Sequence, residues 1–486
     1  MKGRIFFIIV GIFMLGYPVS GMSHCISQEA KDCKNCYFVN EWNRTYGGEF
    51  DDMGYSIVDI GNGYLLGGLT LSYGNGNGDA YLIRVDKEGN EIWEKTYGGS
   101  EEDGIYDLLK VEDGYIIVGK TKSFGQGDYD AWLLKVDEEG NEIWNKTYGG
   151  EEDEVAYSIY GRNDGYLVAG ITSSFGHGNY DAWLLKVDEE GNEIWNKTYG
   201  GTLGDYIYSI KKIENGYVMA GTKTSAHLDF DAWLIKVDNE GNEIWEKTYG
   251  GRGDEIASDV SPTEEGYILS GNLMNLGEGI SDAFLIKVDE EGNEIWNKTY
   301  GGEHIDAFNA VMTVNDGYVA AGVYGLLSKG GGAWIVKTDK NGEIVWNKTI
   351  GGKTGDDYVW TFIKDGEEYV LVGSSTTYSR GGYDVWLIKT SQPQLEIEIQ
   401  GGIGITMLIK NVGNETISNL EFSMRINGFV FFGKTMDGEI SSLPPGMGIE
   451  VNAFVMGFGN AIIEARAGEI SKKADCFILG PFVFIE

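Results

Sequence analysis

The sequence predicts an all-β protein in which a seven-bladed β-propeller, closed by its N-terminal strand, is followed by an immunoglobulin-like β-sandwich. A stretch close to EIWNKTYGG recurs seven times, with its tryptophans 50 or 51 residues apart. Each interval holds four short β-rich segments separated by turn residues, as in a propeller blade. The period stops near residue 390, and alternating strands of another pattern follow.

The first 21 residues are expected to be a signal peptide. Lys2 and Arg4 precede an apolar run over residues 5–19, with cleavage expected after Gly21. The run is shorter than the ~20 residues that a membrane-spanning helix needs. The protein is therefore expected to be secreted or displayed on the cell surface, and the membrane is a partner only through an uncleaved N-terminal anchor.

Residues 22–39 are expected to be a connector that carries three of the four cysteines. An even number of cysteines in an exported chain favours disulfides. The predicted ring closure brings Cys33 and Cys36 near the second domain, so one of them is expected to bond Cys476, with Cys25 taking the other. Local pairing of Cys33 with Cys36, or a metal or redox role of this CxxC, is the alternative.

The repeat over residues 98–148 illustrates the strands and turns predicted for one blade. A polar loop opens it, tight turns follow the first and third segments, and a Gly-rich loop follows the second. The four predicted strands are Ile105–Val111, Tyr115–Thr121, Asp130–Val136 and Glu142–Tyr148.

Ring closure is predicted because the last repeat lacks a fourth strand and the repeat region begins with one that has no blade of its own. The stretch Asn40–Tyr46 is a fourth strand with no blade before it, and the last repeat has no fourth strand after Asp384–Thr390. If these two segments pair, residues 40–391 form a closed ring of seven blades. Closure removes the exposed sheet edges.

Two further repeat positions carry structural predictions. The tryptophans are expected to pack between neighbouring blades, because a large aromatic side chain buries the most apolar area. A glycine four residues after each second-strand tyrosine is expected to mark a close backbone approach. These glycines are Gly68, Gly119, Gly170, Gly221, Gly271, Gly322 and Gly373.

The charge limits the partners. Lys and Arg number 38 and Asp and Glu number 75, which gives a net charge of −37. Such a charge repels nucleic acid and anionic lipid, so neither is expected to bind. Cations and basic partners are favoured.

One face of the predicted propeller carries loops that vary in sequence, and binding concentrates in such loops. Their aromatic residues are candidates for stacking on glycans, although packing within the loop is the alternative. The loop also holds a histidine in two adjacent repeats. The candidate ligand-binding residues are Tyr73, Phe124, Phe175, Phe230, Tyr378, His177 and His227.

An acid follows the second glycine of each repeat by four residues. Seven carboxylates at the start of the inner strands would bind calcium or a basic ligand, with calcium the candidate ion and no other cofactor required. The alternative is that each acid accepts backbone N–H bonds in its own turn. The residues are Asp52, Asp103, Glu154, Asp205, Glu255, Asp306 and Asp356.

Catalytic motifs are scarce, since the chain has no GxSxG, HExxH or phosphate loop. The leading interpretation is a non-enzymatic binding or structural protein that takes an extracellular glycan or protein on its varied face. An extracellular enzyme acting on polysaccharide is the first alternative, and a quinoprotein-like oxidoreductase is the second.

Two segments resemble known families. The stretch KVDEEGNEIW resembles the tryptophan-docking repeat of quinoprotein propellers, but is one residue shorter between Asp and Gly, and those enzymes have eight blades. Residues 40–390 are more similar to secreted archaeal and bacterial propeller repeats of the type GGYDYAxSIxxTxDGGYIVAGxTxSFGxGxYDAWLxKxD. Residues 394–486 alternate as strands, as in an immunoglobulin-like sandwich. Their motifs IKNVGN, SLPPG and GPFVF are similar to C-terminal domains of archaeal surface proteins, which implies a spacer or presenting role.

Overall fold

The computed structural model describes residues 42–274, 281–302, 304–326, 331–352, 355–391, 395–412, 417–444, 446–468 and 470–485. Within these ranges the regular structure is entirely β-strand. The predicted signal peptide, most of the connector, and Cys25, Cys33 and Cys36 lie outside the described residues.

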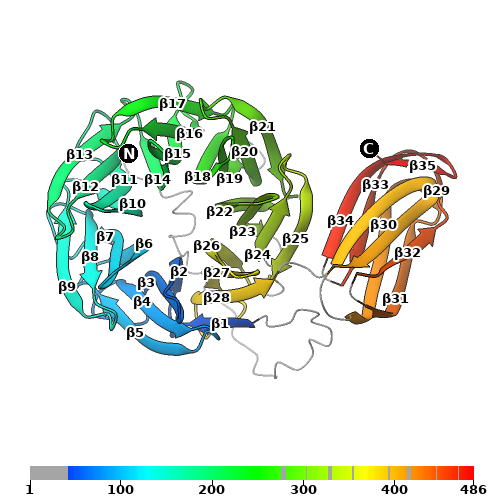
Figure 1. Ribbon diagram of the computed structural model, residues 1–486, viewed down its shortest axis with the longest axis horizontal. Helices are drawn as coiled ribbons and strands as arrows, with labels where there is room; N and C mark the ends of the chain where they lie inside the picture. Colours follow the sequence, from blue (N-terminus) through cyan, green and yellow to red (C-terminus); the bar gives the residue numbers. More distant parts are fainter. Residues whose placement is uncertain are drawn as a thin grey trace, which may run out of the picture. The chain divides into compact units, whose positions relative to one another are not determined.

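Residues 42–391 form a propeller-like ring of antiparallel sheets, shown in Figure 1, with the strand that follows each EIWNKTYGG-like stretch toward the centre. Three four-stranded sheets use four consecutive strands each from the first half of the ring. They are β2 (Asp52–Asp59), β3 (Gly63–Thr70), β4 (Asp79–Asp86) and β5 (Glu91–Tyr97); β6 (Asp103–Val111), β7 (Gly114–Thr121), β8 (Asp130–Val136) and β9 (Glu142–Tyr148); and β10 (Glu154–Arg162), β11 (Gly165–Thr172), β12 (Asp181–Val187) and β13 (Glu193–Tyr199).

A fourth such sheet comes next, followed by one sheet of eight strands. The fourth consists of β14 (Asp205–Ile213), β15 (Gly216–Thr224), β16 (Phe230–Val237) and β17 (Glu243–Tyr249). The larger sheet consists of β18 (Asp254–Thr263), β19 (Gly266–Met274), β20 (Ser281–Val288), β21 (Glu294–Tyr300), β22 (Ile305–Val314), β23 (Gly317–Leu326), β24 (Gly332–Thr338) and β25 (Ile344–Ile350). A single parallel pair, Ser281 with Ile305, joins its two halves.

Both ends of the ring segment build the remaining four-stranded sheet. It orders β1 (Trp42–Tyr46), β28 (Asp384–Ser391), β27 (Glu368–Ser375) and β26 (Asp357–Asp365). β1 runs antiparallel to β28, with Trp42 opposite Lys389 and Tyr46 opposite Val385. The predicted pairing is therefore confirmed for the described part of Asn40–Tyr46. The all-β, propeller-like fold is confirmed as five four-stranded blades and one larger sheet, rather than as seven separate blades.

The aromatic residues of the recurring stretch tie each sheet to the next. The Trp42 ring lies against the turn at Gly89, and the Tyr46 hydroxyl donates a 2.6 Å hydrogen bond to the Gly89 carbonyl. The same pattern recurs around the ring, which confirms that these side chains pack between sheets. Further tyrosine-to-glycine pairs are Tyr97–Gly140, Tyr148–Gly191, Tyr199–Gly241, Tyr249–Gly292 and Tyr300–Gly342.

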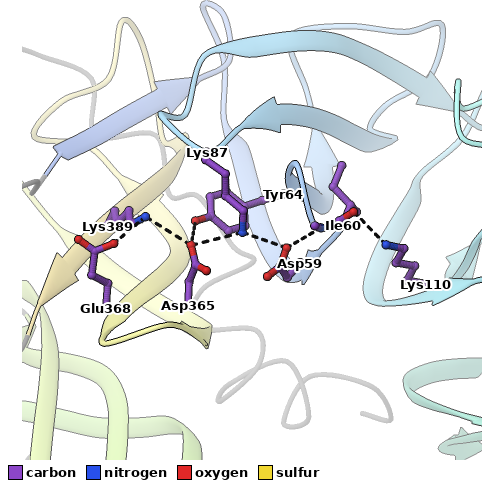
Figure 2. Close-up of polar contacts among 9 residues, drawn as sticks. Asp59, Ile60, Tyr64, Lys87, Lys110, Asp365, Glu368 and Lys389 are labelled. Carbon is purple, nitrogen blue, oxygen red and sulfur yellow. Dashed lines mark hydrogen bonds and ion pairs between the residues drawn. The ribbon is translucent and has the colours of Figure 1, made fainter.

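A polar network joins the sheet that contains β1 and β28 to the sheet formed by β2, β3, β4 and β5. It lies on the side of the tight turns, as Figure 2 shows. Asp365 accepts a 2.5 Å hydrogen bond from the Tyr64 hydroxyl. Its Oδ2 also lies 3.3 Å from the ammonium groups of both Lys87 and Lys389. The Tyr64 hydrogen bond, reinforced by these two lysines, holds the pKa of Asp365 below its usual range. The seam of the ring is thus closed by side chains as well as by β1.

The repeated second-strand glycines face a β-bulge. A Cβ at Gly68 would stand 1.8 Å from the carbonyl oxygen of Met53, and the other six positions are equally tight. In the first blade the pairing register shifts between Gly54 and Ser56, opposite this glycine, so Tyr55 is the extra residue of a bulge. The expected close approach is confirmed, and its cause is the bulge in the paired innermost strand.

Residues 395–485 form one barrel-like sheet of seven strands. Its order is β31 (Thr435–Leu443), β30 (Ile417–Phe432), β33 (Met456–Ala467), β34 (Ile470–Gly480), β35 (Phe482–Ile485), β29 (Leu395–Asn411) and β32 (Gly448–Ala453). The two edge strands share one core, because Leu443 of β31 and Val451 of β32 belong to the same buried cluster. The expected immunoglobulin-like sandwich is not confirmed, since a single curled sheet takes its place.

Cys476 lies in β34 and is 2% exposed, packed with Ala461, Ile463 and Ile478. The three other cysteines lie outside the described residues. The disulfide between Cys476 and Cys33 or Cys36 therefore stays a prediction.

Candidate functional site

Four aromatic residues of the varied loops pack against buried rings of the third strands. Tyr378 stacks on Trp386 with ring centroids 5.4 Å apart, and Tyr73 lies 5.8 Å from Tyr81. Phe124 and Phe175 pack at a tilt on Trp132 and Trp183, with ring centroids 6.2 Å apart in both pairs. All four rings remain about 40% exposed. Each loop therefore presents one fixed aromatic face to solvent.

The other three candidates on this face differ from those four. Phe230 belongs to β16 and packs edge-on against Tyr206 at 6.1 Å. His177 and His227 are exposed, and their backbone amides bond Asp181 and Ser225 within their own loops. Tyr73, Phe124, Phe175 and Tyr378 each pack on a ring of their own sheet, so the structure presents them as separate positions.

Five of the seven acids at the start of the innermost strands are deeply buried, whereas Glu255 and Asp356 are half-buried and Oε2 of Glu255 has no hydrogen-bond partner among the described residues. Asp52 is 0% exposed and accepts the Gly48 amide at 2.7 Å and the Ser72 hydroxyl at 2.7 Å. The Thr70 hydroxyl donates to its other oxygen. Asp103 and Glu154 repeat this pattern. The arrangement fits the turn-capping alternative.

The last repeat corrects one assignment. Asp357, rather than Asp356, accepts the Gly352 amide at 2.7 Å and the Ser375 hydroxyl at 2.6 Å. The loop between the second glycine and the strand is one residue longer in this repeat. The buried acid therefore lies five residues after the glycine, and a count of four gives Asp356 instead. Asp356 is half-buried and contacts the Gly331 amide at 3.4 Å. Across the described chain no three His, Cys, Asp or Glu side chains gather as a metal would require. Calcium binding stays a prediction.

Each of these acids except Asp357 faces a second carboxylate, which belongs to the third strand of the preceding repeat. A Cβ at Gly47 would stand 2.4 Å from Asp52 Oδ2 and 2.7 Å from Asp384 Oδ1. Asp384 is 1% exposed, and its Oδ1 is buried. Burial, with the nearby Asp52 charge adding to it, raises the pKa of Asp384. The equivalent pairs are Asp79–Asp103, Asp130–Glu154, Asp181–Asp205, Asp231–Glu255 and Asp282–Asp306. Gly332 replaces the second acid beside Asp357.

The pKa of Glu255 is raised into a pH range where its effect on stability can be measured. Burial, followed by the charges of Asp231, Asp229 and Asp254, raises its pKa to about 7, against the lowering effect of the Gly251 amide. Between its usual value of 4.5 and about 7, the folded protein holds a proton that the unfolded chain has released. Stability from this group is therefore lost as pH rises through that window.

We expect Glu255→Gln to remove this pH dependence. The variant should gain Tm relative to the wild type as pH rises from about 5 to about 8, because glutamine cannot ionise. The measurement is thermal unfolding across that range. Glu264→Gln, in the exposed turn after β18, is the matched control and should follow the wild type. Parallel Tm curves for wild type and Glu255→Gln would contradict the prediction.

The bulges place a ring of side chains that the sequence reasoning missed. All seven innermost strands shift register at the same repeat position. Five of the seven bulge residues are aromatic, and all seven are half-buried. They are Tyr55, Tyr106, Tyr157, Tyr208, Ser258, Asn309 and Trp360. The glycine opposite each bulge and the repeated aromatic were visible in the sequence, but the bulge that joins them was not.

The next position along these strands ties sheets together. Asp107 accepts the Ser56 hydroxyl at 3.0 Å from one side and the Ile159 amide at 3.0 Å from the other. Asp259 accepts the Ser209 hydroxyl at 2.6 Å and lies 3.3 Å from Lys211. Burial raises the pKa of Asp107. These two acids act as clamps between neighbouring sheets.

The described residues contain no helix of the length and hydrophobicity needed to cross a membrane.

No family model and no curated protein matches this chain, but several solved structures do. Sqt1 from Chaetomium thermophilum is 12% identical and has a TM-score of 0.42, with coverage of 73% of this chain and 100% of that one. A putative 6-phosphogluconolactonase from Bacteroides fragilis is 12% identical, with coverage of 81% and 99% and a TM-score of 0.41.

An acylaminoacyl peptidase from Pyrococcus horikoshii is 11% identical, with coverage of 76% of this chain and 61% of that one, and a TM-score of 0.41. Similarities at this level carry no argument about activity. None of them supports a quinoprotein type, an archaeal surface-protein origin or an immunoglobulin-like second domain.

Proposed function

We propose that this protein is a secreted or cell-surface binding protein whose varied loop face takes an extracellular glycan. The observation that carries this proposal is the set of four loop aromatics, each packed against a buried ring and still about 40% exposed. A ring held from beneath loses little freedom when a sugar stacks on it, so binding costs little conformational entropy. The proposal that the chain is exported rests on the N-terminal sequence alone.

The proposed scaffold is a seven-bladed propeller. We take β18–β21 and β22–β25 as two blades, because each half repeats the antiparallel order of the five separate blades. Within the described ranges, which omit residues 275–280 and 303, the halves are joined by one pair, Ser281–Ile305. A rigid ring of seven blades would hold the variable loops at fixed spacing around one face.

We expect replacement of Tyr73, Phe124, Phe175 and Tyr378 by alanine to abolish glycan binding or weaken it at least about tenfold, since aromatic anchors dominate such surfaces. The measurement is a glycan array of the purified protein, followed by calorimetry on any glycan found. Four outer-strand isoleucines of similar exposure serve as the matched control set for alanine replacement. They are Ile92, Ile143, Ile194 and Ile244.

Two outcomes would overturn this proposal. One is an array on which the folded wild type binds no glycan, and the other is equal weakening by the aromatic and isoleucine replacements. Binding to a protein ligand on the same face would then become the leading function.

A polysaccharide-acting enzyme is the second candidate, favoured by one observation. Glu255 holds its proton close to neutral pH beside the carboxylate of Asp231, which is the pairing that glycoside hydrolysis uses. Release of reducing ends from the bound glycan, lost in Glu255→Gln, would identify an enzyme. Binding without release leaves the non-enzymatic proposal in place.

A further inference from the structure

The aromatic bulge residues form a continuous arc inside the ring. Tyr55 and Tyr106 have ring centroids 5.4 Å apart, and Tyr106 and Tyr157 are 5.1 Å apart. The arc continues to Tyr208 at 5.4 Å and, from Tyr55 in the other direction, to Trp360 at 5.5 Å. Five aromatic side chains from five neighbouring strands therefore touch in series. We call these five residues the aromatic collar.

A β-bulge is the reason that these side chains meet. In a regular strand, successive side chains alternate between the two faces of the sheet, so an inner strand presents none directly along its edge. The extra residue of a bulge is unpaired and re-aims its side chain. Here the bulge recurs at one level in every innermost strand, and each bulge residue stays half-buried. The collar therefore faces space that water reaches.

Asp51 and Glu102 stand directly before β2 and β6, each four residues before a collar residue, Tyr55 or Tyr106. After burial and the neighbouring Tyr106, the charges of Glu102 and Asp51 raise the pKa of Tyr55, so both carboxylates act on its hydroxyl. Asp51 accepts the Tyr383 amide at 2.8 Å, and no cation pairs with it among the described residues. Glu102 is bound to Lys120 at 2.6 Å. The collar thus lies in a negative field within a chain of net charge −37.

A lysine ammonium group already lies over an aromatic ring beside Glu102. The Lys120 ammonium stands 4.2 Å from the centroid of Tyr129 while it pairs with Glu102. Aromatic faces attract ammonium and guanidinium groups, and cages of several rings recognise quaternary ammonium ions. The collar rings are tilted by 38° to 67° to one another, so they offer several faces and edges rather than one flat platform for a sugar.

We propose that the aromatic collar is a binding site for an organic cation carrying a quaternary ammonium or guanidinium group. The rings contact the cation and the Asp51 carboxylate supplies the opposite charge. Ser258 and Asn309 interrupt the arc on two adjacent strands, and they offer a polar sector for a hydroxyl or amide of the ligand. This site lies on the innermost strands and is independent of the glycan proposed for the loop face.

The test is calorimetric titration of the full chain with choline and, separately, with choline's neutral isostere in which carbon replaces the quaternary nitrogen. We expect choline to bind and the isostere not to bind. A third titration uses the amide of acetyl-arginine: binding of choline alone would indicate a free alkylammonium ligand, and binding of both would indicate that a basic side chain also fits. No binding of either cation, or equal binding of choline and its isostere, overturns the proposal.

Variants locate the site. Trp360→Ala and Tyr106→Ala should each weaken choline binding about tenfold, the loss expected for one desolvated cation–π contact. Ile92→Ala removes an exposed side chain of the outer strand β5 and should not change choline affinity. Asp51→Asn keeps the acceptor for the Tyr383 amide and removes the charge, so it should weaken choline binding, whereas the exposed-turn variant Glu112→Gln should not.

These variants keep the proposal falsifiable even if a collar residue is needed for folding. Each variant's melting curve is measured first. If Trp360→Ala or Tyr106→Ala unfolds, the comparison of Asp51→Asn with Glu112→Gln decides in its place. Unchanged choline affinity in folded Trp360→Ala, Tyr106→Ala and Asp51→Asn would show that choline binds elsewhere and would contradict the assignment.

Discussion

Deletion of residues 22–48 is expected to lower the free energy of unfolding of the ring by more than about 3–5 kcal/mol. The deletion removes β1, which is the only strand of its sheet that comes from the N-terminal side of the ring. Tyr46 is buried among Ile57, Tyr81 and Val385, and removal of one buried aromatic side chain alone costs about that much. The open edge of β28 would also be free to pair with other chains.

The measurement is equilibrium denaturation followed by tryptophan fluorescence, with light scattering to detect association. Deletion of residues 22–39 is the control, because it removes the connector and leaves β1 in place. Equal stability of the two deletions would mean that β1 contributes nothing to closure. A large loss in both would assign the stabilisation to the connector instead.

Replacement of Asp357 by alanine is expected to cost about 3–5 kcal/mol of stability. The Gly352 amide, the Ser375 hydroxyl and the Thr377 amide all donate to this carboxylate, which is 0% exposed. Truncation would leave three donors unsatisfied in a buried turn, and each unsatisfied group costs about 1–3 kcal/mol before relaxation. Chemical denaturation of the purified variant measures this loss.

Asp356→Ala is the matched control, one residue away in the same loop. Its side chain accepts one long contact, from Gly331 at 3.4 Å, so we expect a loss below about 1 kcal/mol. The reverse order, with Asp356→Ala the more damaging variant, would restore the sequence-based assignment and contradict the structural one.

The sequence predicted the ring because its elements depend on local patterns that repeat. The turn glycines, the strand alternation and the inter-sheet tryptophans are all short-range features, and the missing fourth strand had a visible counterpart in Asn40–Tyr46. The Asp356 assignment was wrong because it relied on constant spacing. A single inserted residue in an irregular loop moves the buried carboxylate to Asp357 without changing the strands around it.

The collar could not be predicted, because a bulge changes the direction of a side chain and strand periodicity assumes regular pleating. From the sequence, Tyr55 and Tyr106 are therefore expected to be ordinary residues of a regular, alternating strand. The immunoglobulin-like second domain was not confirmed, for a related reason. Alternation in residues such as Ile405, Met407 and Ile409 reports which side faces a core, but it does not distinguish two stacked sheets from one curled sheet.

The pairing of β1 with β28 also means that this sheet cannot be completed until β28 has been synthesised. Trp42 meets Lys389, so the first strand leaves the ribosome long before its partner exists. At about 5–20 residues per second, roughly 350 residues take on the order of 20–70 s to make. Throughout that interval β1 is a lone strand, and its central residues Asn43, Arg44 and Thr45 are polar. Such residues discourage premature association of an unpaired strand, so the composition of β1 suits a segment that must wait for the rest of the ring.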